Sequence, residues 1–196
     1  MLSNSEFTQK NVKKAYGIES KVSYLGVDTD FFKPEKSKKD IDVLYIGAKD
    51  QVDGYDLLKN ALNLIPEKLS VKYHVTGEGW MSDADLKRLY NRAKIVVCLA
   101  NNEPFGLIPL EAAACGVPVI ALNSGGYKET VINERTGYLI EQDSKKLAEK
   151  IQYLLSFPDQ LIEMGKNARR IVESKWNWDT LSAEVEKVFK ELAKEN

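Results

Sequence analysis

The sequence predicts an α/β fold in which a parallel β-sheet carries helices on both faces and further helices follow at the C-terminus. Short, nearly continuous apolar runs alternate with helix-length amphipathic segments through residues 41–140. This alternation is typical of buried parallel strands joined by right-handed crossovers. After Glu141, apolar residues recur only at helical spacing. We therefore expect the sheet to be complete before residue 141.

The N-terminal part of the chain is expected to hold one short helix and one short strand. Residues 3–16 form an amphipathic pattern in which Ser3 or Ser5 can cap the helix, and Gly17 ends it. Residues 21–25 predict a strand. The aspartate-rich passage that follows suits a loop.

Strands and helices then alternate through the centre of the chain. Gly47, Gly77, Asn101 and Gly125 each follow a predicted strand, so they are expected to share the rim of the sheet where ligands bind in such folds. The strands are expected at 41–46, 71–75, 95–99, 118–121 and 136–140, and the helices at 53–65, 83–93, 127–132, 144–156, 159–174 and 178–194.

The segment 101–122, NNEPFGLIPLEAAACGVPVIAL, carries the predicted site. Glu103 lies on a loop and Glu111 about one turn inside the helix that follows. The start of a helix has unpaired N–H groups and partial positive charge, so it suits an anion, and Gly106 lets a ligand approach the backbone. The two carboxylates are expected to grip hydroxyls on either side of that anion. The alternative interpretations are dipole stabilisation by Glu111 and a solvated Glu103.

Two stretches of the sequence resemble a known family. EPFGLIPLEAAACGVPVIA followed by NSGGYKETVINERTGYLIE resembles the donor-binding segment of the retaining group 1 glycosyltransferases, which include glycogen synthase, sucrose synthase and many mannosyltransferases. SNSEFTQKNVKKAYGIESKVSYLGVDTDFFKP resembles the interdomain passage of this family. These enzymes have two Rossmann-like domains that face each other across a cleft, the GT-B arrangement. The resemblance implies that this chain is the C-terminal domain.

The resemblance also implies a division of the chain. Residues 1–36 would be the interdomain passage with a short helix, residues 37–175 the Rossmann-like nucleotide-sugar-binding domain, and residues 176–196 a crossover helix. An absent N-terminal domain would hold the acceptor site. Because the crossover helix packs on that domain in the family, part of its apolar stripe is expected to be exposed here, which would favour self-association.

The resemblance assigns donor contacts to residues along the rim. Glu111 is expected to bind ribose hydroxyls, and Glu103 to contact the transferred sugar, which makes Glu103 the candidate catalytic residue. Glu129 is expected to brace the loop above it, and the alternative is direct contact with the ligand. Gly77 and Glu78 either border the base pocket or form a plain tight turn. Gly77 and Glu78 are thus candidate donor-binding residues, and the others are Gly47, Lys49, Asn102, Phe105, Gly106 and Leu107. The backbone N–H groups of Phe105, Gly106 and Leu107 are expected to hold the diphosphate and sugar.

The sequence departs from the family in the loop after the first strand of the sheet. The family usually has glycine-arginine and then lysine-glycine there, and the two cations neutralise the leaving diphosphate. This chain reads GAKDQVDG, with Ala48 and Asp53 at those positions. Lys49, or more weakly Lys128, is the candidate replacement cation. The departure implies a partly rewired site, a donor with less negative charge, or a domain that has lost catalysis.

By resemblance, the full-length enzyme transfers a mannosyl or glucosyl group from a GDP-, UDP- or ADP-hexose to an acceptor hydroxyl of a surface glycan or glycolipid, with retained configuration. No protein nucleophile is needed, because diphosphate oxygens help to deprotonate the acceptor while the site stabilises the leaving group. The nucleotide sugar is a substrate, and no other cofactor is expected. The isolated chain is expected to bind donor weakly and to be inactive. The alternatives are a non-catalytic interaction module of the same fold and a sugar-nucleotide epimerase.

The composition excludes some classes of binding partner. The chain has 28 basic and 29 acidic residues, so its net charge is close to zero, which argues against a protein that binds nucleic acid through bulk charge. No apolar run reaches the ~20 residues of a spanning helix and no signal-peptide pattern follows Met1, so we expect a cytoplasmic protein, membrane-peripheral at most through the absent half.

Cys98 and Cys115 lie in apolar surroundings, which predicts two reduced, buried thiols. The single His74 offers no zinc cluster, and no metal site is expected.

Overall fold

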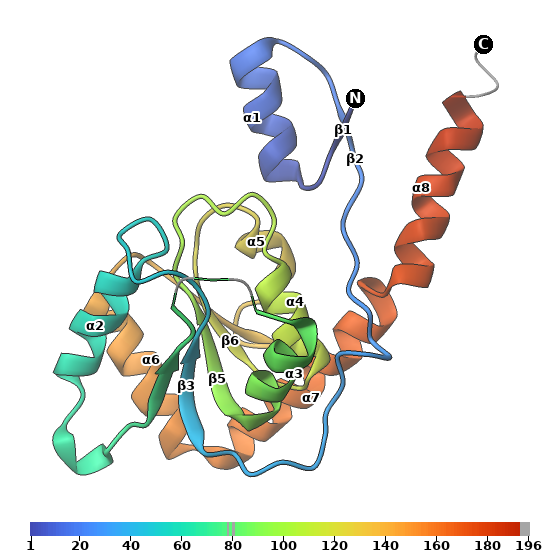
Figure 1. Ribbon diagram of the computed structural model, residues 1–196. Coiled ribbons are helices and arrows are strands. Elements are labelled where there is room, and N and C mark those ends of the chain that lie inside the picture. The colour runs from blue at the N-terminus through green and yellow to red at the C-terminus, as the bar shows by residue number, and fades with distance from the viewer. Residues whose placement is uncertain (78, 80, 193–196) are drawn as a thin grey trace.

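A computed structural model of the chain describes residues 1–77, 79 and 81–192. Its centre is a five-stranded sheet of order β4-β3-β5-β6-β7 in which every neighbouring pair is parallel (Figure 1). The predicted α/β fold is therefore confirmed. The strands are β3 (Ile41–Tyr45), β4 (Tyr73–Val75), β5 (Ala93–Cys98), β6 (Val119–Leu122) and β7 (Gly137–Ile140).

Helices cover both faces of this sheet. Figure 1 shows α2 (Tyr55–Leu64) and α6 (Ser144–Ser156) on one face, and α3 (Asp83–Arg92), α4 (Leu107–Ala114) and α7 (Pro158–Lys175) on the other. The short elements η1 (Glu67–Leu69) and α5 (Tyr127–Thr130) lie in connections. Because helices cover both faces, the middle strands are buried on each side, which explains why they appear in the sequence as continuous apolar runs.

The chain reverses direction across the sheet next to β3. It runs from β3 outward to the edge strand β4 and then returns past β3 to β5. The loops after β3 and β5 therefore leave the sheet in opposite directions. Ligands of open parallel sheets bind beside such a reversal, beyond the carboxyl ends of the strands.

A small parallel pair, β1 (Leu2–Ser3) and β2 (Lys21–Val22), flanks α1 (Glu6–Tyr16) outside the central sheet (Figure 1). Ser5 is the N-cap of α1, since its Oγ accepts a hydrogen bond from the Thr8 N–H at 2.9 Å. β2 is shorter than predicted because the chain then turns toward the start of the last helix, where the Val27 N–H donates to the Trp176 carbonyl at 2.8 Å.

The last helix, α8 (Trp178–Leu192), extends away from the sheet (Figure 1). Leu181 is buried at its base, whereas Trp178 and Phe189 are 53% and 60% exposed. Part of the apolar stripe is therefore exposed, as expected, while self-association and the domain boundaries stay predictions. None of the helices in the described part of the chain is long and apolar enough to cross a membrane. Both cysteines are buried and form no disulfide, as predicted.

One arginine ties α7 to α4 and to the linker that precedes β3. The Arg169 guanidinium donates to the carbonyls of Ala114 at 2.6 Å, Phe32 at 2.7 Å and Thr29 at 3.0 Å, and it also pairs with Glu173. The Ala114 carbonyl belongs to the C-terminal end of α4, where a cation is favoured by the helix dipole. Arg169 therefore fixes the position of α4 from its C-terminal end.

We expect Arg169→Ala to lower the free energy of unfolding by about 2–4 kcal/mol, because three carbonyls lose a charged donor. Urea denaturation followed by circular dichroism measures this loss. Arg170→Ala is the matched control: Arg170 is exposed, bonds Asn167 on its own helix and should change stability by about 0.5 kcal/mol or less. Equal destabilisation by both substitutions would contradict the anchoring role.

Candidate functional site

The start of α4 lies beyond the carboxyl end of β5 and has no side-chain cap. Its N-cap residue, Gly106, adopts the left-handed conformation with φ 97°, and among the described residues no side-chain cap bonds the first turn. Pro109 lies within this turn, where it has no helical N–H bond to lose. The start of α4 opens onto a cavity of about 320 Å³ that is lined by Asn4, Leu25, Glu103, Pro104, Phe105, Gly106, Leu107, Ile108 and Tyr127.

A glycine turn holds the loop that carries Glu103. The Gly126 N–H donates to the Glu103 carbonyl at 2.8 Å, and the Asn102 N–H donates to Ser124 Oγ at 3.0 Å. A Cβ atom on Gly125 would lie 2.3 Å from the Glu103 carbonyl oxygen, so no larger residue fits at this approach. The path of the loop is thus fixed by backbone contact with a second loop.

The two predicted acids lie on different sides of the start of α4. The Glu103 side chain is half-buried in the cavity beside Tyr127 of α5 and has no hydrogen bond to another described residue. Glu111 points toward α3, where its Oε2 accepts a hydrogen bond from the Tyr90 hydroxyl at 2.6 Å. The acids therefore flank the helix start without lining one common cavity.

Tyr90 is a site residue that no motif in the sequence singles out. Its ring is fully buried, and burial followed by the charge of Glu111 raises the pKa of its hydroxyl well above the usual value. Burial also raises the pKa of Glu111, while the Tyr90 hydrogen bond opposes this effect and the charge of Asp83 adds to it. Tyr90 therefore stays protonated and holds one oxygen of the Glu111 carboxylate in place.

A second cavity, of about 440 Å³, lies at the carboxyl ends of β3 and β4. It is shared by two of the predicted rim glycines, Gly47 and Gly77, and the Gly47 N–H donates to Thr76 Oγ1 at 3.1 Å. Lys49 is exposed on the adjoining loop. The predicted site residue Glu78 lies outside the described residues.

Asp53, which stands where the family has a cation, folds back onto its own loop. Its Oδ2 accepts a hydrogen bond from the Ala48 N–H at 2.9 Å, and its own N–H donates to Asp50 Oδ1 at 2.8 Å. The Tyr45 hydroxyl donates to the Ala48 carbonyl at 3.0 Å. A Cβ atom on Gly47 would lie 3.0 Å from Asp53 Oδ2, so the carboxylate lies close to Gly47, which lines the second cavity. An acidic side chain therefore stands where the family has a cation.

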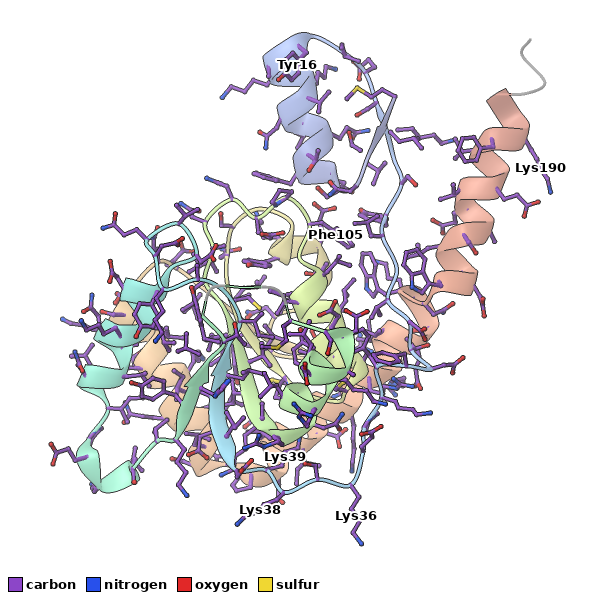
Figure 2. The ribbon with its side chains drawn as sticks, in the orientation of Figure 1. Tyr16, Lys36, Lys38, Lys39, Phe105 and Lys190 are labelled. Carbon is purple, nitrogen blue, oxygen red and sulfur yellow. The ribbon has the colours of Figure 1, made fainter. Side chains whose placement is uncertain are left out.

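Phe105 packs into the core. Figure 2 labels Phe105 between the start of α4 and the N-terminal segment. Its side chain is 2% exposed, and its ring centroid lies 5.7 Å from that of Trp176 and 6.1 Å from that of Tyr24. Only its backbone N–H remains a candidate for contact with a ligand. Leu107, the next residue but one, is 40% exposed at the start of α4.

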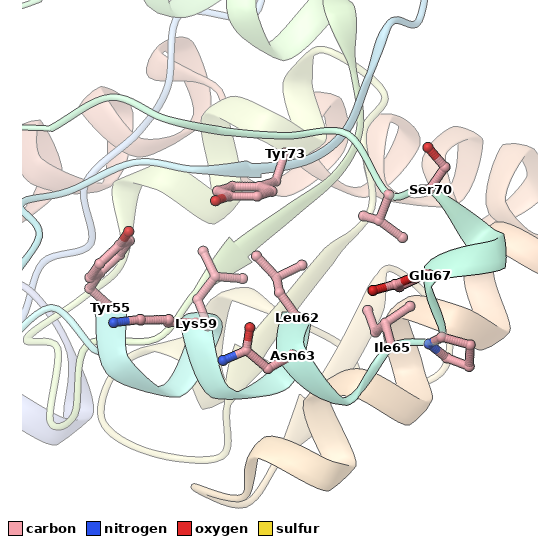
Figure 3. A pocket seen from close by; sticks show the side chains of 11 residues that line it. Tyr55, Lys59, Leu62, Asn63, Ile65, Glu67, Ser70 and Tyr73 are labelled. Atoms are coloured by element: carbon pink, nitrogen blue, oxygen red, sulfur yellow. The ribbon is translucent and has the colours of Figure 1, made fainter.

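A further cavity, of about 250 Å³, lies at the edge of the sheet between α2, η1 and β4 (Figure 3). Tyr73 of the edge strand faces Tyr55, Lys59 and Leu62 of α2 across it. Its described lining includes none of the predicted site residues. Predicted site residues instead line cavities at the carboxyl rim: the two described above and another, next to α1, that is lined by Asn102 together with Thr8 and Pro104.

Solved structures share this arrangement. Sucrose-phosphate synthase from Thermosynechococcus elongatus superposes with a TM-score of 0.85 at 25% identity. The superposition covers 100% of this chain and 58% of the synthase chain. HepE of Anabaena in complex with UDP-glucose gives a TM-score of 0.85 at 21% identity, and the superposition covers 97% of this chain and 63% of the HepE chain. The second likeness shows the fold alone.

The sequence also matches known proteins. The GDP-mannose-dependent alpha-(1-6)-phosphatidylinositol monomannoside mannosyltransferase of Mycobacterium tuberculosis is 29% identical over 226 residues, which cover 92% of this chain and 59% of that relative. The chain thus spans less than two thirds of the relative. The model of the family Glycosyl transferases group 1 matches residues 67–171, more than half of the chain. The resemblance in the sequence is confirmed, and the chain belongs to the family of group 1 glycosyl transferases.

Proposed function

We propose that the chain is the donor-binding domain of a retaining glycosyltransferase that moves a mannosyl or glucosyl group from a nucleotide sugar to an acceptor hydroxyl of a surface glycan or glycolipid. The observation that carries the proposal is the uncapped start of α4, which opens onto a cavity lined by Glu103. Family membership supports sugar transfer. The mannosyltransferase relative is named for GDP-mannose, and HepE was solved with UDP-glucose, so both donors are candidates.

In this proposal each part of the rim has one task. The N–H groups of Phe105, Gly106 and Leu107 bind the diphosphate and stabilise the charge that develops on it as the sugar leaves. Glu103 accepts hydrogen bonds from the transferred sugar, and Glu111 accepts them from the ribose. The cavity beside Gly47 and Gly77 receives the base. The acceptor site would lie in a second domain, which the 59% coverage of the relative supports.

A second candidate function is a non-catalytic module that keeps the fold as an interaction surface. The position of Asp53 favours it, because a carboxylate at the rim repels a diphosphate that the family binds with cations. The family match favours sugar transfer over the third candidate, a sugar-nucleotide epimerase.

Calorimetric titration of the 196-residue chain with UDP, GDP, ADP and their hexose conjugates tests the proposal. We expect weak binding of one nucleotide and its sugar. Glu111→Ala should weaken both about tenfold or more, because it removes the ribose contact, whereas Glu103→Ala should weaken only the nucleotide sugar. Glu149→Ala, which removes an exposed carboxylate of α6, is the control. No heat with any nucleotide would instead support the non-catalytic module.

Tyr90→Phe should weaken nucleotide binding about tenfold at neutral pH, because a hydrogen bond to a charged group is lost and Glu111 is no longer held. Ribose hydroxyls need the ionised carboxylate, so affinity falls as pH drops through the raised pKa of Glu111. Removing the Tyr90 donor raises that pKa further, which moves the loss of affinity to higher pH. Dissociation constants measured across pH 5–8 check this; an unchanged pH profile would contradict it.

Asp53→Asn should strengthen diphosphate binding about threefold to tenfold at low ionic strength, because the amide oxygen can still accept from the Ala48 N–H while the negative charge is gone. Titration with UDP and GDP at two salt concentrations measures the gain, which salt should reduce. The uncharged nucleosides uridine and guanosine serve as control ligands, and their affinity should not change. Equal gains for nucleoside and nucleotide would show that charge is not the cause.

A further inference from the structure

Glu129 makes contacts that the proposed function does not use. It lies on α5, and both of its carboxylate oxygens accept hydrogen bonds from the first turn of α1: the Glu6 N–H donates to Oε2 at 2.9 Å and the Phe7 N–H to Oε1 at 3.0 Å. These N–H groups have no partner inside their own helix, and the positive end of a helix favours a carboxylate. Glu129 therefore acts as a second cap for α1, supplied from a distant part of the chain.

Ser5 and Thr8 join α1 to the other loop of the rim. The fully buried Ser5 Oγ donates to the Pro104 carbonyl at 2.5 Å, and Thr8 Oγ1 approaches the same carbonyl at 3.3 Å. Pro104 directly follows Glu103. The start of α1 is thus bonded to the loop that carries the candidate catalytic residue.

The two groups of contacts end on loops that are themselves joined. Glu129 lies just after Gly126, whose N–H donates to the Glu103 carbonyl. Burial raises the pKa of Tyr24, and its hydrogen bond to Glu129 adds to this effect. The Tyr24 ring lies in turn against that of Phe105. Glu129 therefore stands between the N-terminal segment and both loops around the start of α4.

We propose that Glu129 is a positioning residue that locks α1 onto these two loops and thereby holds Glu103 and the start of α4 in the geometry that binds the donor. The inference deepens the proposed function and rests on it for its effect on binding. A carboxylate suits this task because it accepts two N–H groups with fixed spacing, so α1 cannot shift without breaking both bonds. A shift of α1 would accordingly reach the loop of Glu103 directly through Ser5 and Thr8, and Glu129 resists that shift.

The test compares Glu129→Ala and Glu129→Gln with the parent 196-residue chain, with Glu149→Ala as the matched exposed control. Amide hydrogen exchange is followed by NMR at Glu6 and Phe7, which report on α1, and at Asn102 and Gly126, which report on the loops. Binding of GDP-mannose and UDP-glucose is titrated well below the melting temperature of every variant. At that temperature a merely stabilising residue leaves affinity unchanged.

We expect Glu129→Ala to speed exchange at all four amides and to raise the dissociation constant about fivefold or more. Glu129→Gln, which keeps one oxygen acceptor, should be intermediate, and it preserves the test if the alanine variant does not fold. Faster exchange confined to Glu6 and Phe7 would overturn the proposal, as would unchanged affinity in a parent chain that binds donor. A parent chain that binds neither sugar nucleotide refutes the proposed function instead, and the exchange pattern alone then decides whether Glu129 positions the loops.

Discussion

The site depends on one backbone contact, the approach of the turn at Gly125 and Gly126 to the loop of Glu103 and Phe105. A Cβ atom on Gly126 would lie 2.4 Å from the Phe105 Cα, and one on Gly125 would lie 2.3 Å from the Glu103 carbonyl oxygen. Side chains are excluded from both positions, so the two loops meet as bare backbone. This contact sets where α4 begins and on which side of it Glu103 lies. The pairing of β5 with β6 brings the two loops to the same rim.

The electrostatics of the rim rest on amides more than on cations. The uncapped start of α4 offers N–H groups and a partial positive charge, whereas Asp53 adds a negative charge beside Gly47. One hydrogen bond offsets part of this charge, because the Asp53 carboxylate accepts it from the Ala48 N–H. A full charge acts over a longer distance than a helix terminus does, so Asp53 would weaken the binding of a diphosphate in the proposed function. The exposed Lys49 is the nearest cation in sequence to oppose it.

The features that the sequence could predict are those encoded locally. Apolar runs indicated the parallel sheet, and the Ser5 cap and most helix limits followed from residue type and spacing. The site contacts join residues that are distant in sequence, such as Tyr90 with Glu111, and no local pattern encodes them. The hydrogen bond from the Ala48 N–H to Asp53 depends on how the loop between them folds, which residue types alone do not specify. The two-residue strand β1 is too short to leave a periodic signal.

The segment before the linker completes the site from outside the sheet. Asn4 and Leu25 line the cavity of Glu103, and the ring of Tyr24 lies against that of Phe105. The sheet alone would therefore leave the start of α4 open on that side. Loops with few buried contacts sample open states more readily than packed strands do, so their order depends on what docks against them. The affinity of this rim for a ligand is accordingly a property of the sheet and of the docked N-terminal segment together.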